Sequence, residues 1–337
     1  MLLLFGFVLI LIAGFLQGTF FLPMTFTRKW EWEHTWFTFS LTGMFIFNWI
    51  FIFATVPEIF TIFKTAPSRD ILIIIIFGSL WGIGAILTGL AMDKLGMALA
   101  YPIVIGLVSS LGALIPLIVF FPATLFTVKG LVLIIGTAGT IVGVIMCSRA
   151  FSRKETSTDF AANTRTGSLA VKLAIAISAG VMSALMNVGF AYGVSLVETA
   201  RTLGISETFA INVAWAIILT CGGIVNLLYC LYLMIKRNTL KDFIGPETAR
   251  NLGLGSLMGI IWCGGLYIYG MGVSSLGGWG VVVGWVLFMS VNIIVGNLWG
   301  IWRGEWKEAS QSARALLNRG LIVIIIAIII VAVSNSL

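Results

Sequence analysis

The side chains that could do chemistry in this sequence are mainly amides and aromatic rings set in apolar stretches. The chain has one histidine, His34, and it lacks the HExxH and GxSxG motifs of metal-dependent and serine hydrolases. With so little material for acid–base or nucleophilic chemistry, the sequence predicts a protein that is not an enzyme. The amide and aromatic side chains in the apolar stretches are Gln17, Asn48, Asn187, Asn212, Asn226, Asn292, Asn297, Trp81, Tyr101, Trp215, Trp262, Tyr267, Tyr269 and Trp285.

These residue types suit a neutral sugar, which presents hydroxyl groups and an apolar face of C–H groups. A pocket for such a ligand needs a few amide or hydroxyl partners and an aromatic wall. The alternative for each asparagine is a hydrogen bond between helices, and for each tryptophan it is packing or a place at the membrane interface. The residue types alone leave both interpretations open at every position.

Two carboxylates are candidates for proton coupling, because ion-driven carriers usually keep an ionisable side chain at membrane depth. Asp93 ends one apolar run beside Lys94, and Glu198 lies beyond the end of another. An interfacial ion pair for Asp93 and a solvated position for Glu198 are the alternatives, and His34 fits an interfacial position. A facilitator that moves its substrate without protons therefore stays open.

The four cysteines form no CxxC pair and fit small packing positions, so we expect no metal and no cofactor. Of all residues 59% are hydrophobic and 10% are charged, and the mean hydropathy is +1.08. Such a composition excludes a water-soluble domain and predicts an all-α integral membrane protein with ten transmembrane helices. The expected spans are 2–22, 36–57, 71–92, 97–121, 130–147, 170–192, 208–235, 252–272, 277–301 and 320–336.

The net charge of +7 indicates membrane orientation rather than nucleic-acid binding, because the basic residues stand in short loops between the spans. The loops after the first, third, fifth, seventh and ninth spans carry sixteen of the 20 Lys and Arg residues. By the positive-inside rule this side is cytoplasmic, and both termini face outward. The expected surroundings are the lipid bilayer, and Trp30, Trp32 and Trp36 fit its interfacial belt.

The longest charged connection, residues 148–168, is expected to be a polar cytoplasmic linker between two sets of five spans. Similar short sequences occur at corresponding places in the two sets: "AGFLQG" at 13–18 and "AGVMSA" at 179–184, "GSLWGI" at 78–83 and "GSLMGI" at 255–260. Because each set holds an odd number of spans, the similarity predicts two inverted five-helix repeats, 1–147 and 169–337.

Glycines four residues apart recur in the spans, and Gly78 with Gly82 and Gly255 with Gly259 belong to the repeated "GSL" sequence. Such pairs let helices approach closely in lipid, and the alternative is that some of these faces slide during transport. The first copy carries Trp81, whereas the second has its tryptophan one turn later, at Trp262. We expect the two indoles to lie on similar helix faces and to border a shared cavity.

Several ordered motifs resemble a known family. They are "FFLPMTFTRKWEWEHTW" at 20–36, "FGSLWGIG" and "GLAMDKLGM" within 77–97, Glu198 in "ETARTLG", "GGIVN" at 222–226, Trp262 with Tyr269, "GWVLFMS" at 284–290 and "GEW" at 304–306. They are similar to the L-rhamnose/proton symporter family of the drug/metabolite transporter superfamily. The resemblance extends over almost the whole chain and implies ten helices in two inverted halves.

The resemblance implies a secondary transporter in the bacterial inner membrane that moves a small neutral sugar with a proton by alternating access. It places the pocket among six spans and favours as substrate-binding residues Gln17, Trp81, Tyr101, Asn187, Trp262 and Trp285. This sequence has Ala85, Thr88, Gly265 and Phe288 where the family carries polar side chains, so a sugar or polyol other than rhamnose is also compatible. An exporter of amino acids, drugs or metabolites and an uncoupled sugar facilitator are the alternatives.

Overall fold

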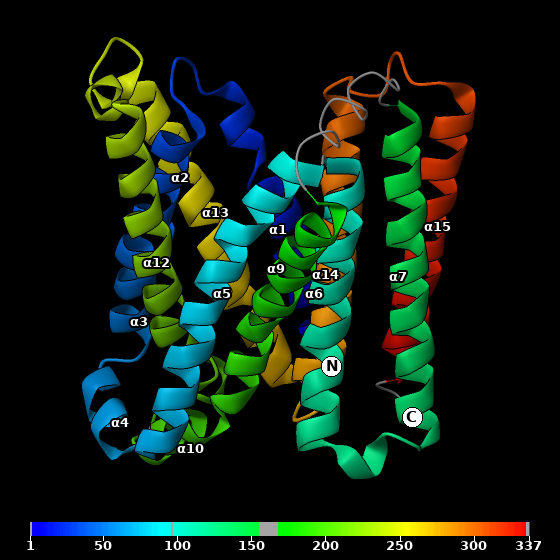
Figure 1. The fold of residues 1–337 in the computed structure, drawn as a ribbon. Coiled ribbons are helices and arrows are strands. Elements are labelled where there is room, and N and C mark those ends of the chain that lie inside the picture. Colours follow the sequence, from blue (N-terminus) through cyan, green and yellow to red (C-terminus); the bar gives the residue numbers. More distant parts are fainter. Residues whose placement is uncertain (1, 96, 155–167, 335–336) are drawn as a thin grey trace. The chain divides into compact units, whose positions relative to one another are not determined.

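The computed structural model describes residues 2–95, 97–154, 168–334 and 337, where helices are joined by turns and short connections (Figure 1). Within these ranges, ten stretches of helix are long and apolar enough to cross a membrane. The expected all-α fold with ten transmembrane helices is thus confirmed. The inverted repeat stays a prediction.

The elements include short 3-10 turns (η1, η3 and η4) and one π-helical turn (η2). In chain order they are α1 (Leu2–Thr19), η1 (Leu22–Phe26), α2 (Trp32–Ser40), η2 (Leu41–Phe47), α3 (Asn48–Thr55), α4 (Ile59–Thr65), α5 (Ser68–Leu95), α6 (Met97–Phe120), η3 (Pro122–Thr124), α7 (Val128–Lys154), α9 (Leu169–Tyr192), α10 (Val194–Thr202), α11 (Glu207–Ala210), α12 (Val213–Arg237), η4 (Leu240–Phe243), α13 (Thr248–Ser275), α14 (Gly280–Trp302) and α15 (Gln311–Ser334).

Two helices extend furthest beyond the expected spans because polar turns continue an apolar helix. α15 begins at Gln311, where the Ser310 hydroxyl accepts the Ala313 backbone N–H at 3.2 Å and so caps the first turn. α7 continues as far as Lys154, into the expected linker 148–168. Residues 155–167 of that linker lie outside the described residues.

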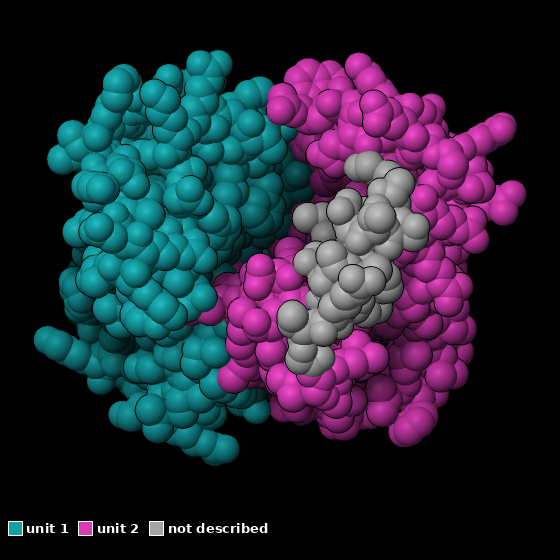
Figure 2. All heavy atoms as spheres, turned by 45° about the horizontal axis from the view of Figure 1, so that its top comes forward, with its two compact units in different colours: residues 1–83, 189–277 teal, residues 84–188, 278–337 magenta. Residues whose placement is uncertain are grey.

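The chain forms two compact units, which are coloured separately in Figure 2. Unit 1 comprises residues 1–83 and 189–277, and unit 2 comprises residues 84–188 and 278–337. Each unit takes helices from both sides of the linker. In unit 1, α1 packs along α13, and in unit 2, α7 lies beside α15 (Figure 1).

The repeated glycine pairs of unit 1 stand where helices approach most closely. A Cβ atom at Gly82 would lie 2.8 Å from the Gly222 Cα atom of α12, and one at Gly259 of α13 would lie 2.6 Å from the Gly43 backbone nitrogen of η2. Real side chains do not approach backbone so closely, hence both copies of the sequence contain a glycine that lets two helices touch. These contacts confirm the expected packing role.

The helix that begins at Trp32 changes its winding at η2, the π-helical turn that contains Gly43. Its end is fixed by Asn48, whose amide Nδ2 donates to the Met44 carbonyl oxygen at 3.1 Å. The Tyr267 hydroxyl of α13 donates to Asn48 Oδ1 at 2.6 Å. A π-helical turn is uncommon and often stands at a functional site, and here it lies against the helix that carries Trp262.

Candidate functional site

Two tryptophans from distant parts of the sequence meet inside unit 1. Trp81 of α5 and Trp262 of α13 stack with ring centroids 5.7 Å apart and planes inclined by 11°. Only 7% of Trp81 and 4% of Trp262 is exposed. The structure therefore brings together the two indoles that the sequence places on similar helix faces.

Further rings and a glycine enclose this pair. Phe39 of α2 meets Trp262 edge to face, with centroids 5.4 Å apart, and Phe20 stacks on Phe39 at 5.6 Å. On the α12 side, a Cβ atom at Gly222 would lie 2.3 Å from the Trp81 ring, so only glycine leaves space for the indole there. The indoles thus belong to an aromatic cluster in direct contact.

Gln17 of α1 supplies an amide beside the aromatic cluster. Its Oε1 atom is buried and has no hydrogen-bond partner among the described residues. A Cβ atom at Gly265 would lie 3.6 Å from this oxygen, and Gly265 follows Trp262 by less than one turn of α13. A buried acceptor without a donor is unusual, and a ligand hydroxyl is one group that would satisfy it.

Two predicted site residues lie together in unit 2, where each donates a hydrogen bond to backbone. Asn187 Nδ2 of α9 donates to the Gly112 carbonyl oxygen at 2.8 Å and approaches that of Val281 at 3.3 Å. Trp285 Nε1 of α14 donates to the Val108 carbonyl oxygen at 3.0 Å. Both side chains therefore tie helices together.

The third predicted residue of unit 2, Tyr101, is half-buried near the start of α6, close enough to the Cys147 thiol of α7 for an electrostatic interaction. It shares no described contact with Asn187 or Trp285.

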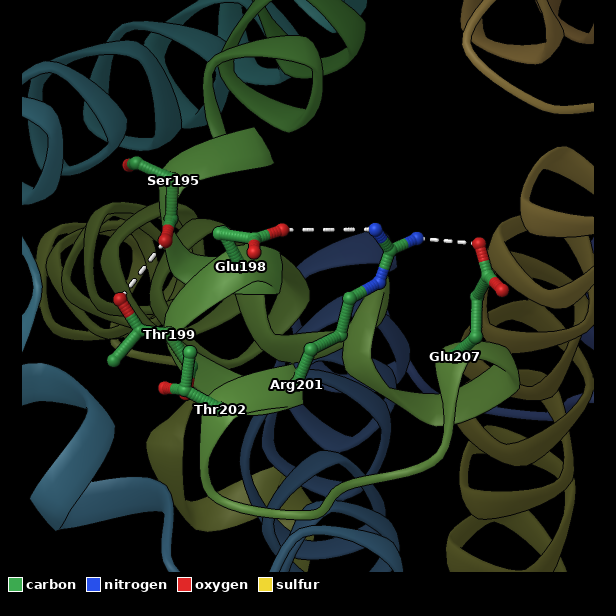
Figure 3. A network of polar contacts seen from close by, with 6 residues as sticks. All are labelled: Ser195, Glu198, Thr199, Arg201, Thr202 and Glu207. Carbon is green, nitrogen blue, oxygen red and sulfur yellow. Dashed lines mark hydrogen bonds and ion pairs between the residues drawn. The ribbon is translucent and has the colours of Figure 1, made fainter.

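The predicted coupling carboxylates are both exposed. The Glu198 side chain on α10 is 70% exposed, and its Oε2 atom lies 3.6 Å from Arg201 Nη1. Figure 3 shows the Arg201 guanidinium between Glu198 and Glu207, with which it also forms an ion pair. Asp93 is exposed near the end of α5. Neither carboxylate has the burial expected of an ionisable group at membrane depth.

One fully buried carboxylate, Glu33, is not among the site residues predicted from the sequence. The Glu33 side chain, in the first turn of α2, is 0% exposed, and its Oε2 atom lies 3.0 Å from Arg237 Nη1 at the end of α12. The Thr239 hydroxyl donates to its Oε1 atom at 3.3 Å. Its position between Trp32 and Trp36 was a sign in the sequence that Glu33 could be buried. These two tryptophans give the first turn of the helix an apolar face.

His34 is fixed beside this ion pair. Its Nδ1 atom accepts the Glu31 backbone N–H at 3.1 Å, and its Nε2 atom lies 2.8 Å from the Thr239 carbonyl oxygen. With Nδ1 as acceptor, Nε2 carries the hydrogen and donates. His34 is fully buried, and it links α2 to the segment that follows α12.

Ten membrane-spanning helices and a buried aromatic cluster with an amide define a multi-pass membrane protein with the features of a carrier. The profile of the family described as L-rhamnose-proton symport protein (RhaT) matches residues 2–336, so the chain belongs to this family. As the sequence predicts, this is a family of transporters and not of enzymes.

Individual relatives match this chain over nearly their whole length. The L-rhamnose-proton symporter of Klebsiella pneumoniae (strain 342) is 28% identical over 336 residues, which cover 97% of this chain and 96% of the relative. The L-rhamnose-proton symporter of Cronobacter sakazakii is 28% identical and that of Escherichia coli (strain 55989 / EAEC) is 27% identical, with the same coverage. The similarity therefore extends over all ten spans.

Proposed function

We propose that this chain imports L-rhamnose or a closely related neutral sugar together with a proton across the bacterial cytoplasmic membrane. Membership of the L-rhamnose-proton symport protein family supports the reaction type. The main observation that supports the proposed binding site is the stacked pair of Trp81 and Trp262 beside the unpartnered Gln17 oxygen. Indole faces suit the C–H face of a sugar ring, and an amide oxygen suits a sugar hydroxyl.

The indole pair acts as an aromatic gate in this proposal. Centroids 5.7 Å apart are in direct contact, which leaves no space for a sugar ring between the two indoles. A sugar therefore stacks on Trp81 or Trp262 only when the pair separates, as an alternating-access cycle allows. Gln17 lies on α1, which packs along α13, so its amide oxygen stays beside Trp262 and can bind a hydroxyl when the two indoles separate.

Two predicted residues of unit 2 have a structural role in this proposal. Asn187 and Trp285 enter the proposal as positioning residues, because their donors are bound to backbone carbonyl oxygens. Tyr101 stays a prediction from the sequence, and the binding site proposed here is built from unit 1 residues alone.

We also infer that both termini face outward and that residues 1–147 and 169–337 are inverted repeats. The charge distribution among the loops supports the orientation. The short similar sequences at corresponding places in the two halves support the repeat.

The test of this function is uptake by the purified protein in liposomes, with an acidic exterior and a panel of labelled compounds. The panel contains L-rhamnose, other neutral hexoses and polyols, an amino acid and a cationic drug. We expect uptake of a deoxyhexose that unlabelled L-rhamnose reduces by competition. Movement of the amino acid or the drug, with no response to any sugar, would assign the chain to an exporter of the same superfamily instead.

A further inference from the structure

Glu33 and Arg237 form an ion pair whose two sides are in different surroundings. The Glu33 side chain is 0% exposed, whereas that of Arg237 is 53% exposed. If the pair separates, the guanidinium can enter water, but the carboxylate stays enclosed. A buried carboxylate without its cation is strongly destabilised, and the usual outcome is that it binds a proton. Separation of this pair is therefore linked to protonation of Glu33.

Two donors and a helix end face the Glu33 carboxylate while the pair is closed. Arg237 Nη1 and the Thr239 hydroxyl both donate to the carboxylate, and its place in the first turn of α2 adds the favourable end of the helix dipole. Two further titratable groups near Glu33 are the Cys230 thiol of α12 and His34 of α2. His34 is bound on both ring nitrogens, and a thiol supplies no cation that could replace Arg237.

The helix that carries Glu33 also reaches the aromatic gate. Phe39 stands six residues further along α2, about 9 Å along the axis, and meets Trp262 edge to face. Between them, Trp36 Nε1 donates to Asn226 Oδ1 of α12 at 2.9 Å. A movement of α2 relative to α12 therefore acts on the contact with the Trp262 indole.

We propose that Glu33 binds the transported proton and that Arg237 is its reversible counterion. This inference rests on the proposed function, proton-coupled sugar transport. A proton adds to one Glu33 carboxylate oxygen to give a neutral carboxylic acid, and the Arg237 guanidinium keeps its charge and moves into water. The pair then no longer holds the start of α2 to the end of α12. When Arg237 returns, the acid loses its proton to water and the ion pair forms again.

The position of Glu33 differs from that of the exposed carboxylate Glu198. α12 begins a few residues after Glu207, the partner of Arg201, and ends at Arg237, the partner of Glu33. Its 25 residues span roughly 37 Å, so the two ion-pair clusters lie at opposite ends of unit 1. The Glu198 side chain is already 70% exposed, so its protonation changes no buried charge. It therefore serves as the matched control.

The experiment compares Glu33→Gln with Glu198→Gln in liposomes. Glutamine keeps the shape of the Glu33 side chain and its hydrogen bond from Thr239, but it cannot lose a proton. We expect accumulation of labelled L-rhamnose driven by an acidic exterior to fall by roughly tenfold or more in Glu33→Gln. Counterflow, the exchange of internal for external sugar without a proton gradient, is expected to persist. Glu198→Gln is expected to accumulate sugar as the parent does.

A second variant keeps the test independent of how well Glu33→Gln folds. Arg237→Gln changes a half-exposed side chain and leaves the Glu33 carboxylate without its cation. The carboxylate then binds its proton more readily, so we expect the pH at which accumulation is half-maximal to move upward. An unchanged pH profile in Arg237→Gln would contradict the proposed pair.

Each remaining outcome of these experiments also supports or contradicts the proposed role of Glu33. Normal accumulation by Glu33→Gln would overturn the proposal, and so would loss of both accumulation and counterflow in a stably folded variant, because that pattern indicates a general structural role. Selective loss of accumulation in Glu198→Gln would assign coupling to Glu198. A parent protein that transports no sugar would instead overturn the proposed function, and this inference with it.

Discussion

Trp81 and Trp262 lie face to face with centroids 5.7 Å apart, although they belong to α5 in the first half of the sequence and α13 in the second. In this contact the facing surfaces of the two indoles cover each other. The same two residues are the proposed stacking surfaces for the sugar, so the contact between them and the binding of substrate exclude each other. This exclusion is the basis of the proposed gate.

Replacement of either indole by a smaller ring should weaken sugar binding more than it weakens the fold. For Trp262→Phe and Trp81→Phe we expect a loss of about 1 kcal/mol in binding, roughly fivefold in Kd, because less ring area stacks on the sugar. Binding is measured on purified protein by tryptophan fluorescence or calorimetry, together with Tm.

The control for these variants is Trp49→Phe, since Trp49 also belongs to unit 1 but donates its Nε1 hydrogen bond to Thr220 instead. It should bind sugar as the parent does. If Trp262→Phe and Trp81→Phe both keep the Kd of the parent, the indoles only pack helices.

Gln17 should matter for binding and not for stability. Gln17→Met keeps a side chain of similar length but removes the buried Oε1 atom, which has no donor in the described residues. We expect Tm to stay the same or rise, because an unsatisfied buried acceptor is removed, while sugar affinity falls by roughly fivefold or more.

Asn226, an amide with hydrogen-bond partners, should show the opposite pattern, in which stability depends on the side chain. Asn226 Oδ1 accepts the Trp36 indole N–H and its Nδ2 donates to the Gly222 carbonyl oxygen, so Asn226→Leu should lower the free energy of unfolding by about 1–3 kcal/mol. Equal Tm losses in Gln17→Met and Asn226→Leu would show that Gln17 is a structural residue.

The close approach of α13 to η2 predicts a strong effect of a single methyl group. In Gly259→Ala the new Cβ atom would lie 2.6 Å from the Gly43 nitrogen, so the helices must separate. We expect a Tm loss of several degrees, or little folded protein, in detergent. Gly253→Ala is the control on the same helix, because its Cβ atom would meet nothing within 4 Å. Similar Tm values for the two variants would contradict the close contact.

The orientation in the membrane is tested by reporter fusions after Leu337. A reporter that is active only outside the cytoplasm should work there, because the positive-inside rule applied to the basic loops predicts an outward C-terminus. A fusion after Arg237 to a reporter that needs the cytoplasm serves as the opposite case. The reversed pattern would overturn the orientation and leave the helical fold unaffected.

The fold was largely predictable from the sequence because long apolar runs report directly on membrane spans. The ends of the helices were less predictable, since the first turn of α15 is polar and depends on the Ser310 cap. The grouping of residues 1–83 with 189–277 was not predictable, because no local pattern tells which helices of the two halves pack together.

The site was predictable in part. Trp81 and Trp262 share a helical phase within similar sequences, so their meeting follows from periodicity. The burial of Glu33 could not be predicted in this way, because its cation, Arg237, is distant in the sequence and the surrounding tryptophans resemble an interfacial belt. Glu198 is exposed rather than buried, and its partner Arg201 also forms an ion pair with Glu207.

The central claim is that sugar and proton move together, and the pH of a weakly buffered medium tests it most directly. Liposomes that contain the protein are placed in such a medium without a gradient, and L-rhamnose or the best sugar of the panel is added. Proton symport predicts an immediate rise in external pH that scales with the sugar taken up and disappears with a protonophore. Sugar uptake with no change in external pH would contradict the claim and identify an uncoupled facilitator.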